Sequence, residues 1–174
     1  MRGTGLSGEL MTLRALLVAP LLAVALAAAA EKPSFTSGVW QGNANYDADG
    51  EFRDCTMTAQ SGDDIQLGFV ITKDFNWGLV LADEARDLPV GSTMAMILQI
   101  DQRDPIAAVA KVVDIHGLLI PLANSDPVIE ALRQGKVLRI VTGGTTLSFK
   151  LTGTRDAIAQ LAACVTDHLD SERI

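Results

Sequence analysis

Cysteine, histidine and aromatic residues are scarce in this sequence. It contains two cysteines, Cys55 and Cys164, and two histidines, His116 and His168, while aromatic residues make up 5% of the chain. The cysteines do not form a Cys-x-x-Cys pair, which excludes the motif of thiol–disulfide oxidoreductases. A Gly-x-Ser-x-Gly elbow is also absent, which argues against α/β-hydrolase chemistry. The sequence therefore carries no recognisable catalytic set.

Basic residues are also in the minority. The chain has 14 lysines and arginines against 21 aspartates and glutamates, for a formal net charge of −7. Dispersed negative charge repels nucleic acids and anionic membrane surfaces, and no basic stripe offsets it. We therefore expect no nucleic-acid partner.

Charge is absent from residues 15–30, a run of alanine, leucine, valine and one proline. Arg14 precedes the run and small alanines end it, which is the pattern of a secretory signal peptide. The run is shorter than the roughly 20 residues that span a bilayer, although an uncleaved anchor is the alternative. We predict a signal peptide at residues 1–30, with Met1 or Met11 as the start. Cleavage leaves a single β-rich domain at residues 31–174, periplasmic or secreted, with no stable membrane span.

An even number of cysteines in an exported chain favours a disulfide, and here one intramolecular pairing exists, Cys55 with Cys164. It would close a loop of about 110 residues and stabilise the fold by roughly 4–5 kcal/mol at most on the chain-entropy model. Two free buried thiols are the alternative.

Alternating apolar residues separated by glycine-, asparagine- and aspartate-containing turns predict about eight strands. They are expected at residues 39–46, 51–59, 65–72, 77–82, 91–101, 106–114, 136–142 and 145–151. The first four read as an antiparallel meander.

A short helix is expected at residues 128–134, between Pro127 and Gly135. A second helix begins at Thr154 with an apolar stripe beside Cys164, and residues 167–174 are expected to fray. The predicted class is α+β: a β-rich antiparallel sheet or half-open barrel with a short helix and a packed C-terminal helix. The disulfide would join that last helix to the second strand.

Three features resemble a group of uncharacterised small secreted bacterial proteins. One is Trp77-Gly78-Leu79, followed by Gly91 and Leu98-Gln99-Ile100-Asp101. Another is Phe149-Lys150-Leu151-Thr152-Gly153-Thr154 leading to Cys164-Val165, and the third is the early Cys55. The resemblance covers most of residues 31–174 and implies no activity, cofactor or catalytic residue.

Metal ligands are sparse. Asp47, Asp49 and Glu51 imitate the first half of a calcium loop, with a hairpin turn as the alternative. Asp114 and His116 would share one face of a strand, whereas His168 would lie near a helix end. We expect no metal and no other cofactor, and the three acidic residues are the candidates if a metal binds.

The aromatic residues of the first half suggest a surface instead. Trp40, Trp77 and Phe75 are the candidates for a binding surface, with core packing as the alternative. We therefore predict an exported, non-catalytic binding or accessory protein whose partner is another envelope or secreted protein. A structural envelope protein is the first alternative, and a metal-dependent hydrolase using Asp114, His116 or the Asp47–Glu51 loop ranks below it.

Overall fold

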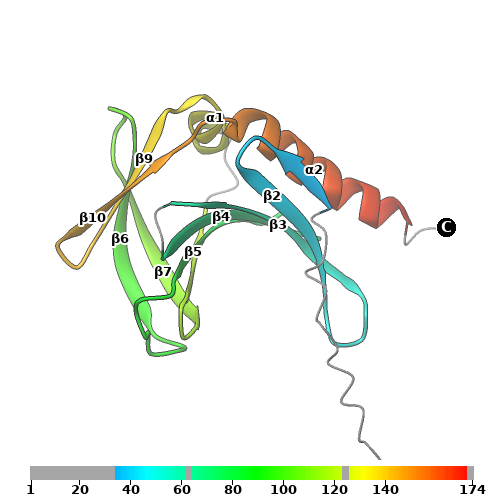
Figure 1. The fold of residues 1–174 in the computed structure, drawn as a ribbon, viewed down its shortest axis with the longest axis horizontal. Helices are drawn as coiled ribbons and strands as arrows, with labels where there is room; N and C mark the ends of the chain where they lie inside the picture. The colour runs from blue at the N-terminus through cyan, green and yellow to red at the C-terminus, as the bar shows by residue number, and fades with distance from the viewer. Residues whose placement is uncertain (1–33, 62–63, 123–125, 172–174) are drawn as a thin grey trace, which may run out of the picture. The chain divides into compact units, whose positions relative to one another are not determined.

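The computed structural model describes residues 34–61, 64–122 and 126–171, so the predicted signal peptide at residues 1–30 lies outside the described residues. The described residues form ten strands and two helices (Figure 1). The strands are β1 (Phe35–Ser37), β2 (Trp40–Tyr46), β3 (Phe52–Gln60), β4 (Ile65–Thr72), β5 (Trp77–Asp83), β6 (Thr93–Ile100), β7 (Ile106–Asp114), β8 (Gly117–Pro121), β9 (Val137–Thr142) and β10 (Thr145–Lys150). The helices are α1 (Asp126–Gln134) and α2 (Thr154–Ser171).

All ten strands belong to one antiparallel sheet in the order β1-β2-β3-β4-β5-β8-β7-β6-β9-β10. The first five strands form the expected meander, whereas β6, β7 and β8 run back so that β8 pairs with β5. Among the described residues β1 and β10 each have one neighbour, so the sheet is not closed. The predicted α+β class with a short helix and a C-terminal helix is confirmed.

Two of the ten strands were not predicted, each for a physical reason. Strand β1 has three residues and is defined by its pairing with β2, where the Phe35 ring occupies the space that a side chain at Gly42 would need. Strand β8 shows no alternation of apolar and polar residues, because Leu119 is half-buried on one face while Leu118 and Ile120 are buried on the other. Periodicity does not detect such strands.

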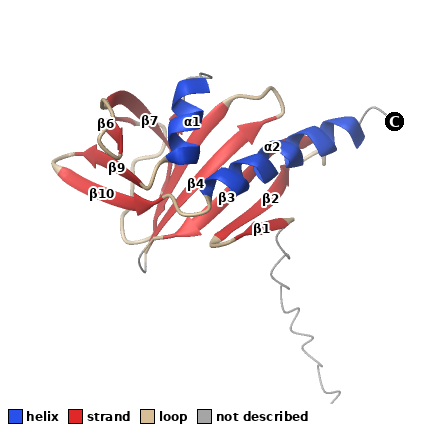
Figure 2. Ribbon diagram, turned by 90° about the horizontal axis from the view of Figure 1, so that it is seen from above, coloured by secondary structure: helices blue, strands red, loops and turns tan. Residues whose placement is uncertain are grey.

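The sheet has two faces of different character, because successive side chains along a strand point in opposite directions. The inner face carries the core, and neighbouring strands align Met57, Phe69, Leu79 and Ile120 in one buried row. Helix α2 packs on this face across β1–β4 (Figure 2). We call the opposite face the outer face.

Helix α2 follows its apolar stripe and continues further than expected. Ile158, Leu161 and Val165 are buried against the sheet, as the spacing predicted. The prediction that the chain frays from residue 167 is wrong, because the helix continues to Ser171. Leu169 packs against the core, and His168 Nδ1 lies 2.7 Å from the Cys164 carbonyl oxygen. Residues 172–174 lie outside the described residues.

The disulfide between Cys55 and Cys164 is present, with a Cα–Cα distance of 6.3 Å. It joins β3 to α2 and links residues 109 apart in sequence, as predicted. Both cysteines are buried, so the bond lies within the interface between helix and sheet.

We expect the double variant Cys55→Ala/Cys164→Ala to lose about 2–5 kcal/mol of unfolding free energy, because its unfolded chain is no longer constrained by the long closed loop. Chemical denaturation of the oxidised protein and the variant measures the difference. A reductant should shift the transition of the parent protein and leave that of the variant unchanged. Equal stability, or two thiols that can be alkylated in the native parent protein, contradicts the expectation.

The turn after β6 is held by Asp101, whose φ of 52° is unusual for a residue with a side chain. Its carboxylate accepts hydrogen bonds from the Val137 and Lys136 N–H groups at the start of β9. The Val137 bond lowers the pKa of Asp101 below its usual value, and the Lys136 bond and the charge of Arg103 act in the same direction against desolvation. Asp101 thus joins two segments distant in sequence.

A carboxyl group with a lowered folded-state pKa stabilises the fold above its unfolded pKa, and this stabilisation is lost as pH falls through the folded value. We therefore expect Asp101→Asn, which tolerates the same backbone conformation, to be less stable at neutral pH. Its stability should also fall less steeply on acidification below about pH 4. Urea unfolding as a function of pH measures both effects, with Asp104→Asn in the same turn as control. Parallel pH profiles for Asp101→Asn and the parent protein would contradict this assignment.

Candidate functional site

A hollow of about 580 Å³ lies on the outer face, between the β2–β3 side and β7–β8. Its polar side chains, other than Arg53 and Asp54, are Gln41, Asn43, Asn45, Thr56, Thr58 and Thr72. Its aliphatic side chains are Val70, Val80, Val113 and Leu119. We call this site the outer hollow. Its volume falls within the roughly 300–1,000 Å³ of small-ligand sites.

The strand register places these side chains side by side. Asn43 pairs with Thr56, which pairs with Val70, so a carboxamide, a hydroxyl and an isopropyl group follow one another across three strands. In the neighbouring row, Val80 on β5 pairs with Leu119 on β8. The outer hollow therefore changes from polar on β2 and β3 to aliphatic on β5 and β8.

A hydrogen-bonded cluster forms the polar end of the outer hollow. Asn45 Nδ2 donates to Asp54 Oδ1 at 2.6 Å and to Thr56 Oγ1 at 2.7 Å, and Thr56 Oγ1 donates to Asp54 Oδ1 at 3.0 Å. Arg53 Nε donates to Asp54 Oδ2 at 2.6 Å. Asp54 is 7% exposed, so these partners offset much of the cost of burying its charge. The cluster is thereby held in a fixed arrangement.

Two neighbouring strands carry glycine on the outer face, and side chains that line the outer hollow pack over both glycines. Gly68 pairs with Val80, and Gly78 pairs with Val70, so the two glycines lie diagonally across β4 and β5. A Cβ at Gly68 would lie 2.9 Å from the Met57 carbonyl oxygen, and one at Gly78 would lie 2.8 Å from Leu119 Cδ1. Neither position accepts a side chain without movement of its neighbours.

The three aromatic candidates for a binding surface separate in the structure. Trp40 is 0% exposed, donates from Nε1 to the Thr152 carbonyl oxygen and packs edge-on against Phe69. The suggestion that Trp40 forms a binding surface is therefore corrected: it is a core residue. Trp77 is half-buried and packs against the core.

Phe75 is the exposed member of the three, at 46%. It lies in the turn between β4 and β5, where its φ is 59°, and its N–H donates to the Thr72 carbonyl oxygen. A bulky residue with positive φ is strained. Thr72 lines the outer hollow, so the turn that carries Phe75 begins at its edge.

The acidic residues of the suggested calcium loop lie in the turn between β2 and β3. Asp47 Oδ1 accepts hydrogen bonds from the Asp49 and Glu51 N–H groups, at 3.0 and 2.9 Å, and Gly50 takes a φ of 83°. This is the chemistry of an aspartate–glycine hairpin turn. The carboxylates of Asp49 and Glu51 are exposed and belong to no group of three clustered ligands among the described residues.

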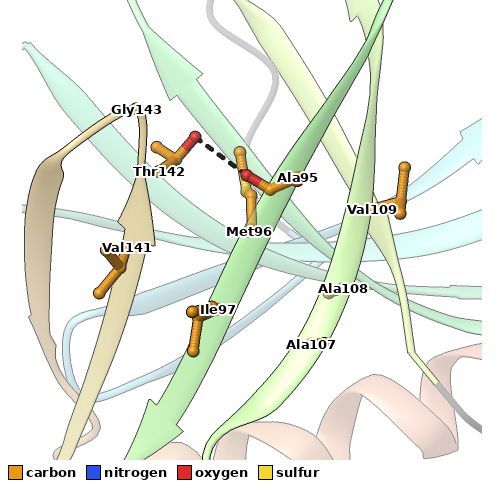
Figure 3. Close-up of a pocket in the computed structure, with 9 residues that line it drawn as sticks. All are labelled: Ala95, Met96, Ile97, Ala107, Ala108, Val109, Val141, Thr142 and Gly143. Carbon is orange, nitrogen blue, oxygen red and sulfur yellow. Dashed lines mark hydrogen bonds between the residues drawn. The ribbon is translucent and has the colours of Figure 1, made fainter.

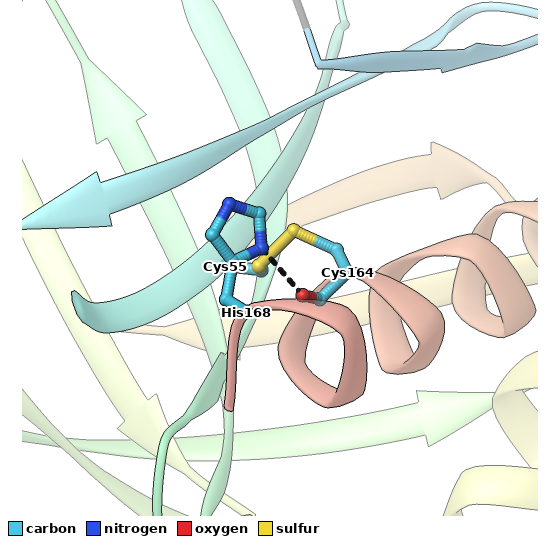
Figure 4. Close-up of side chains that lie close together, drawn as sticks. All are labelled: Cys55, Cys164 and His168. Atoms are coloured by element: carbon cyan, nitrogen blue, oxygen red, sulfur yellow. Dashed lines mark hydrogen bonds between the residues drawn. A yellow bond between two sulfur atoms is a disulfide. The ribbon is translucent and has the colours of Figure 1, made fainter. Parts of the chain in front are cut away.

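One group of three potential metal ligands occurs among the described residues, and it surrounds the disulfide (Figure 4). The ligand atoms of Cys55, Cys164 and His168 lie within 4.8 Å of one another. The two sulfurs are bonded to each other and offer no thiolate. His168 stacks on Phe52, with ring centroids 5.0 Å apart. The oxidised group is therefore a structural disulfide beside a packed histidine.

Asp114 and His116 lie at the turn between β7 and β8, outside the outer hollow. Asp114 Oδ1 accepts a hydrogen bond from the His116 N–H, and His116 Nδ1 lies 3.2 Å from the Arg86 carbonyl oxygen. His116 Nδ1 also lies 3.9 Å from Asp87 Oδ1, whose side chain is largely exposed. These contacts stabilise a turn.

A second hollow, of about 540 Å³, lies over β6, β7 and β9 and is almost wholly apolar (Figure 3). Ala95, Ile97, Ala107, Val109 and Val141 line it, and the register places them on the outer face. We call it the apolar hollow. It has few polar groups that could orient a small ligand, which distinguishes it from the outer hollow.

The outer hollow was not predicted from the sequence, although a signal was present. Gln41, Asn43 and Asn45 alternate with inward residues, as do Asp54, Thr56 and Thr58. Polar residues on one side of a strand ordinarily indicate solvent exposure. The predicted meander makes the two strands neighbours, but which of their residues lie opposite each other is known only from the register.

Comparison with solved structures shows the fold of the chain. The crystal structure of invasion associated protein b from Bartonella henselae is similar to this chain, with a TM-score of 0.57 and 22% sequence identity. The match covers 76% of this chain and 97% of that chain. No protein-family model and no curated protein matches the sequence.

Neither helix among the described residues has the length and apolar character needed to cross a bilayer.

Proposed function

We propose that the chain is an exported, non-catalytic binding protein that holds its ligand in the outer hollow and acts in the periplasm or outside the cell. The observation that carries this proposal is the preorganised cluster of Asn45, Asp54 and Thr56 on a sheet face that no described helix covers. Binding surfaces gain affinity when their polar groups are fixed before the ligand arrives.

The disulfide supports the proposed location, because such bonds persist in oxidising compartments. The predicted signal peptide is consistent with the same route. The similarity to the invasion associated protein supports the fold and adds no functional residue, so the functional argument depends on the outer hollow.

Blocking the outer hollow tests this proposal. Asn43 is exposed on β2, and Asn43→Trp would place a large ring over the polar half of the outer hollow while preserving the strand. The full chain is immobilised and incubated with envelope extract and culture medium, and retained compounds and proteins are identified by mass spectrometry. We expect the parent protein to retain a component that Asn43→Trp loses.

The matched control is Gln102→Trp, which adds the same ring to an exposed turn between β6 and β7. This variant should retain the component as the parent protein does. The proposal is contradicted if Asn43→Trp retains the component as well as the parent protein does. It is also contradicted if the parent protein retains no component from either source.

A structural envelope role is the second candidate, and the apolar hollow favours it. Ile97 and Val109 are 46% and 58% exposed. Ile97 on β6 pairs with Val141 of the β9–β10 hairpin, whose outer strand has one neighbour among the described residues, and Val109 lies on the next strand, β7. A contiguous apolar patch near an open sheet edge is suited to contact with a second copy of the chain.

Self-association through the apolar hollow predicts that the parent protein sediments as a dimer or larger assembly in a concentration-dependent manner. Val109→Lys should shift it to the monomer, because a charge would be buried at the contact. Val39→Lys, at a 66% exposed valine in the β1–β2 turn, is the control and should leave the assembly intact. A monomeric parent protein at all concentrations excludes this role.

A further inference from the structure

We infer that the ligand of the outer hollow is a neutral carbohydrate chain, an inference that rests on the proposed function. The argument uses the charge of the hollow, the hydrogen-bonding groups on its polar half and the shape of its aliphatic half.

The outer hollow carries no net charge. Arg53 and Asp54 are its two charged lining residues, and their side chains form an ion pair at 2.6 Å. The chain as a whole has a formal net charge of −7, which opposes the approach of anions. A charged ligand would therefore find no excess of either charge among the lining residues.

The polar half suits a ligand that both donates and accepts hydrogen bonds at closely spaced positions. Carboxamide and hydroxyl side chains do both, and among the described residues Gln41 and Thr58 have no side-chain hydrogen-bond partner. Asn43 Oδ1 accepts a hydrogen bond from the Ser34 N–H at 3.3 Å, which leaves the Asn43 NH₂ group to donate to a ligand. Sugar hydroxyl groups have the same dual capacity and occur on adjacent carbons. The neighbouring Asn45–Asp54–Thr56 cluster fixes one end of this array.

The aliphatic half suits the C–H face of a sugar ring. Val70, Val80 and Leu119 are half-buried, and Gly68 and Gly78 between them carry no side chain. An aliphatic surface beside hydrogen-bonding groups matches a ring that is apolar on its faces and polar around its edge. A peptide backbone alternates its polar groups on opposite edges and matches this one-sided arrangement less well.

Nuclear magnetic resonance of the full chain, labelled with ¹⁵N, tests the inference directly, since side-chain NH₂ groups of asparagine and glutamine give their own signals. The probes are the neutral oligosaccharides chitotetraose, cellotetraose and maltotetraose, an oligogalacturonate as the anionic counterpart, and a glycine–alanine tetrapeptide. We expect at least one neutral oligosaccharide to shift the signals of Gln41, Asn43 and the β3 amides in a saturable manner.

Asn43→Ala should weaken that binding roughly tenfold, the loss expected from one hydrogen-bonding side chain. Gln102→Ala removes an exposed carboxamide from a turn and should bind as the parent protein does. The inference is overturned if none of the neutral oligosaccharides shifts these signals, if the shifts lie outside the outer hollow, or if the anionic probe or the tetrapeptide binds more tightly.

This experiment separates the ligand class from the proposed function. If retention from extract depends on Asn43 while every oligosaccharide fails, the outer hollow is a binding site for another class of ligand. If retention is independent of Asn43, the proposed function itself is wrong.

Discussion

The attachment of α2 to the inner face of the sheet is the constraint on which the remaining structure depends. The helix buries Ile158, Leu161 and Val165 against β1–β4, and the Cys55–Cys164 bond holds it there covalently. Burial of apolar area drives this contact, and the disulfide limits the unfolded alternatives. Because α2 and the inner face complete the core, the outer face of the same strands does not need to pack against another element and can carry polar side chains.

On this face Asp54 is nearly buried, and its hydrogen-bond partners come from its own strand and the neighbouring one. Its acceptors are satisfied by Arg53, Asn45 and Thr56, all on β2 and β3. An unpaired buried carboxylate would be strongly destabilising, so the cluster must form together with the strand pair. The geometry of the polar half is therefore established by the register of two strands and does not require α2 to approach it.

Local patterns predicted much of the fold, and long-range pairings determined the rest. Eight of the ten strands and both helices follow from alternation and turn residues, because each depends on a short stretch of sequence. The disulfide follows from the cysteine count, because the chain has two cysteines. Strand β1 is recognised by its pairing with the strand that carries Gly42, and β8 lacks alternation, so neither could be predicted locally.

Trp40 shows the same limit, because its aromatic ring suits either a surface or a core. Only its three-dimensional neighbours Phe69 and Thr152 distinguish the two. The outer hollow likewise needed the register that aligns Asn43, Thr56 and Val70.

Charge links the composition of the chain to the selectivity of the outer hollow. The net charge of −7 acts over about the Debye length, roughly 8 Å at physiological salt, and affects every anion that approaches. Within the hollow the Arg53–Asp54 pair cancels at short range, so discrimination there depends on hydrogen-bond geometry and on contact with Val70, Val80 and Leu119. A long-range field that opposes anions and a neutral contact surface act in the same direction. Together they favour ligands whose recognition is local and uncharged, which is the physical basis for assigning the outer hollow to a neutral, hydroxyl-rich chain.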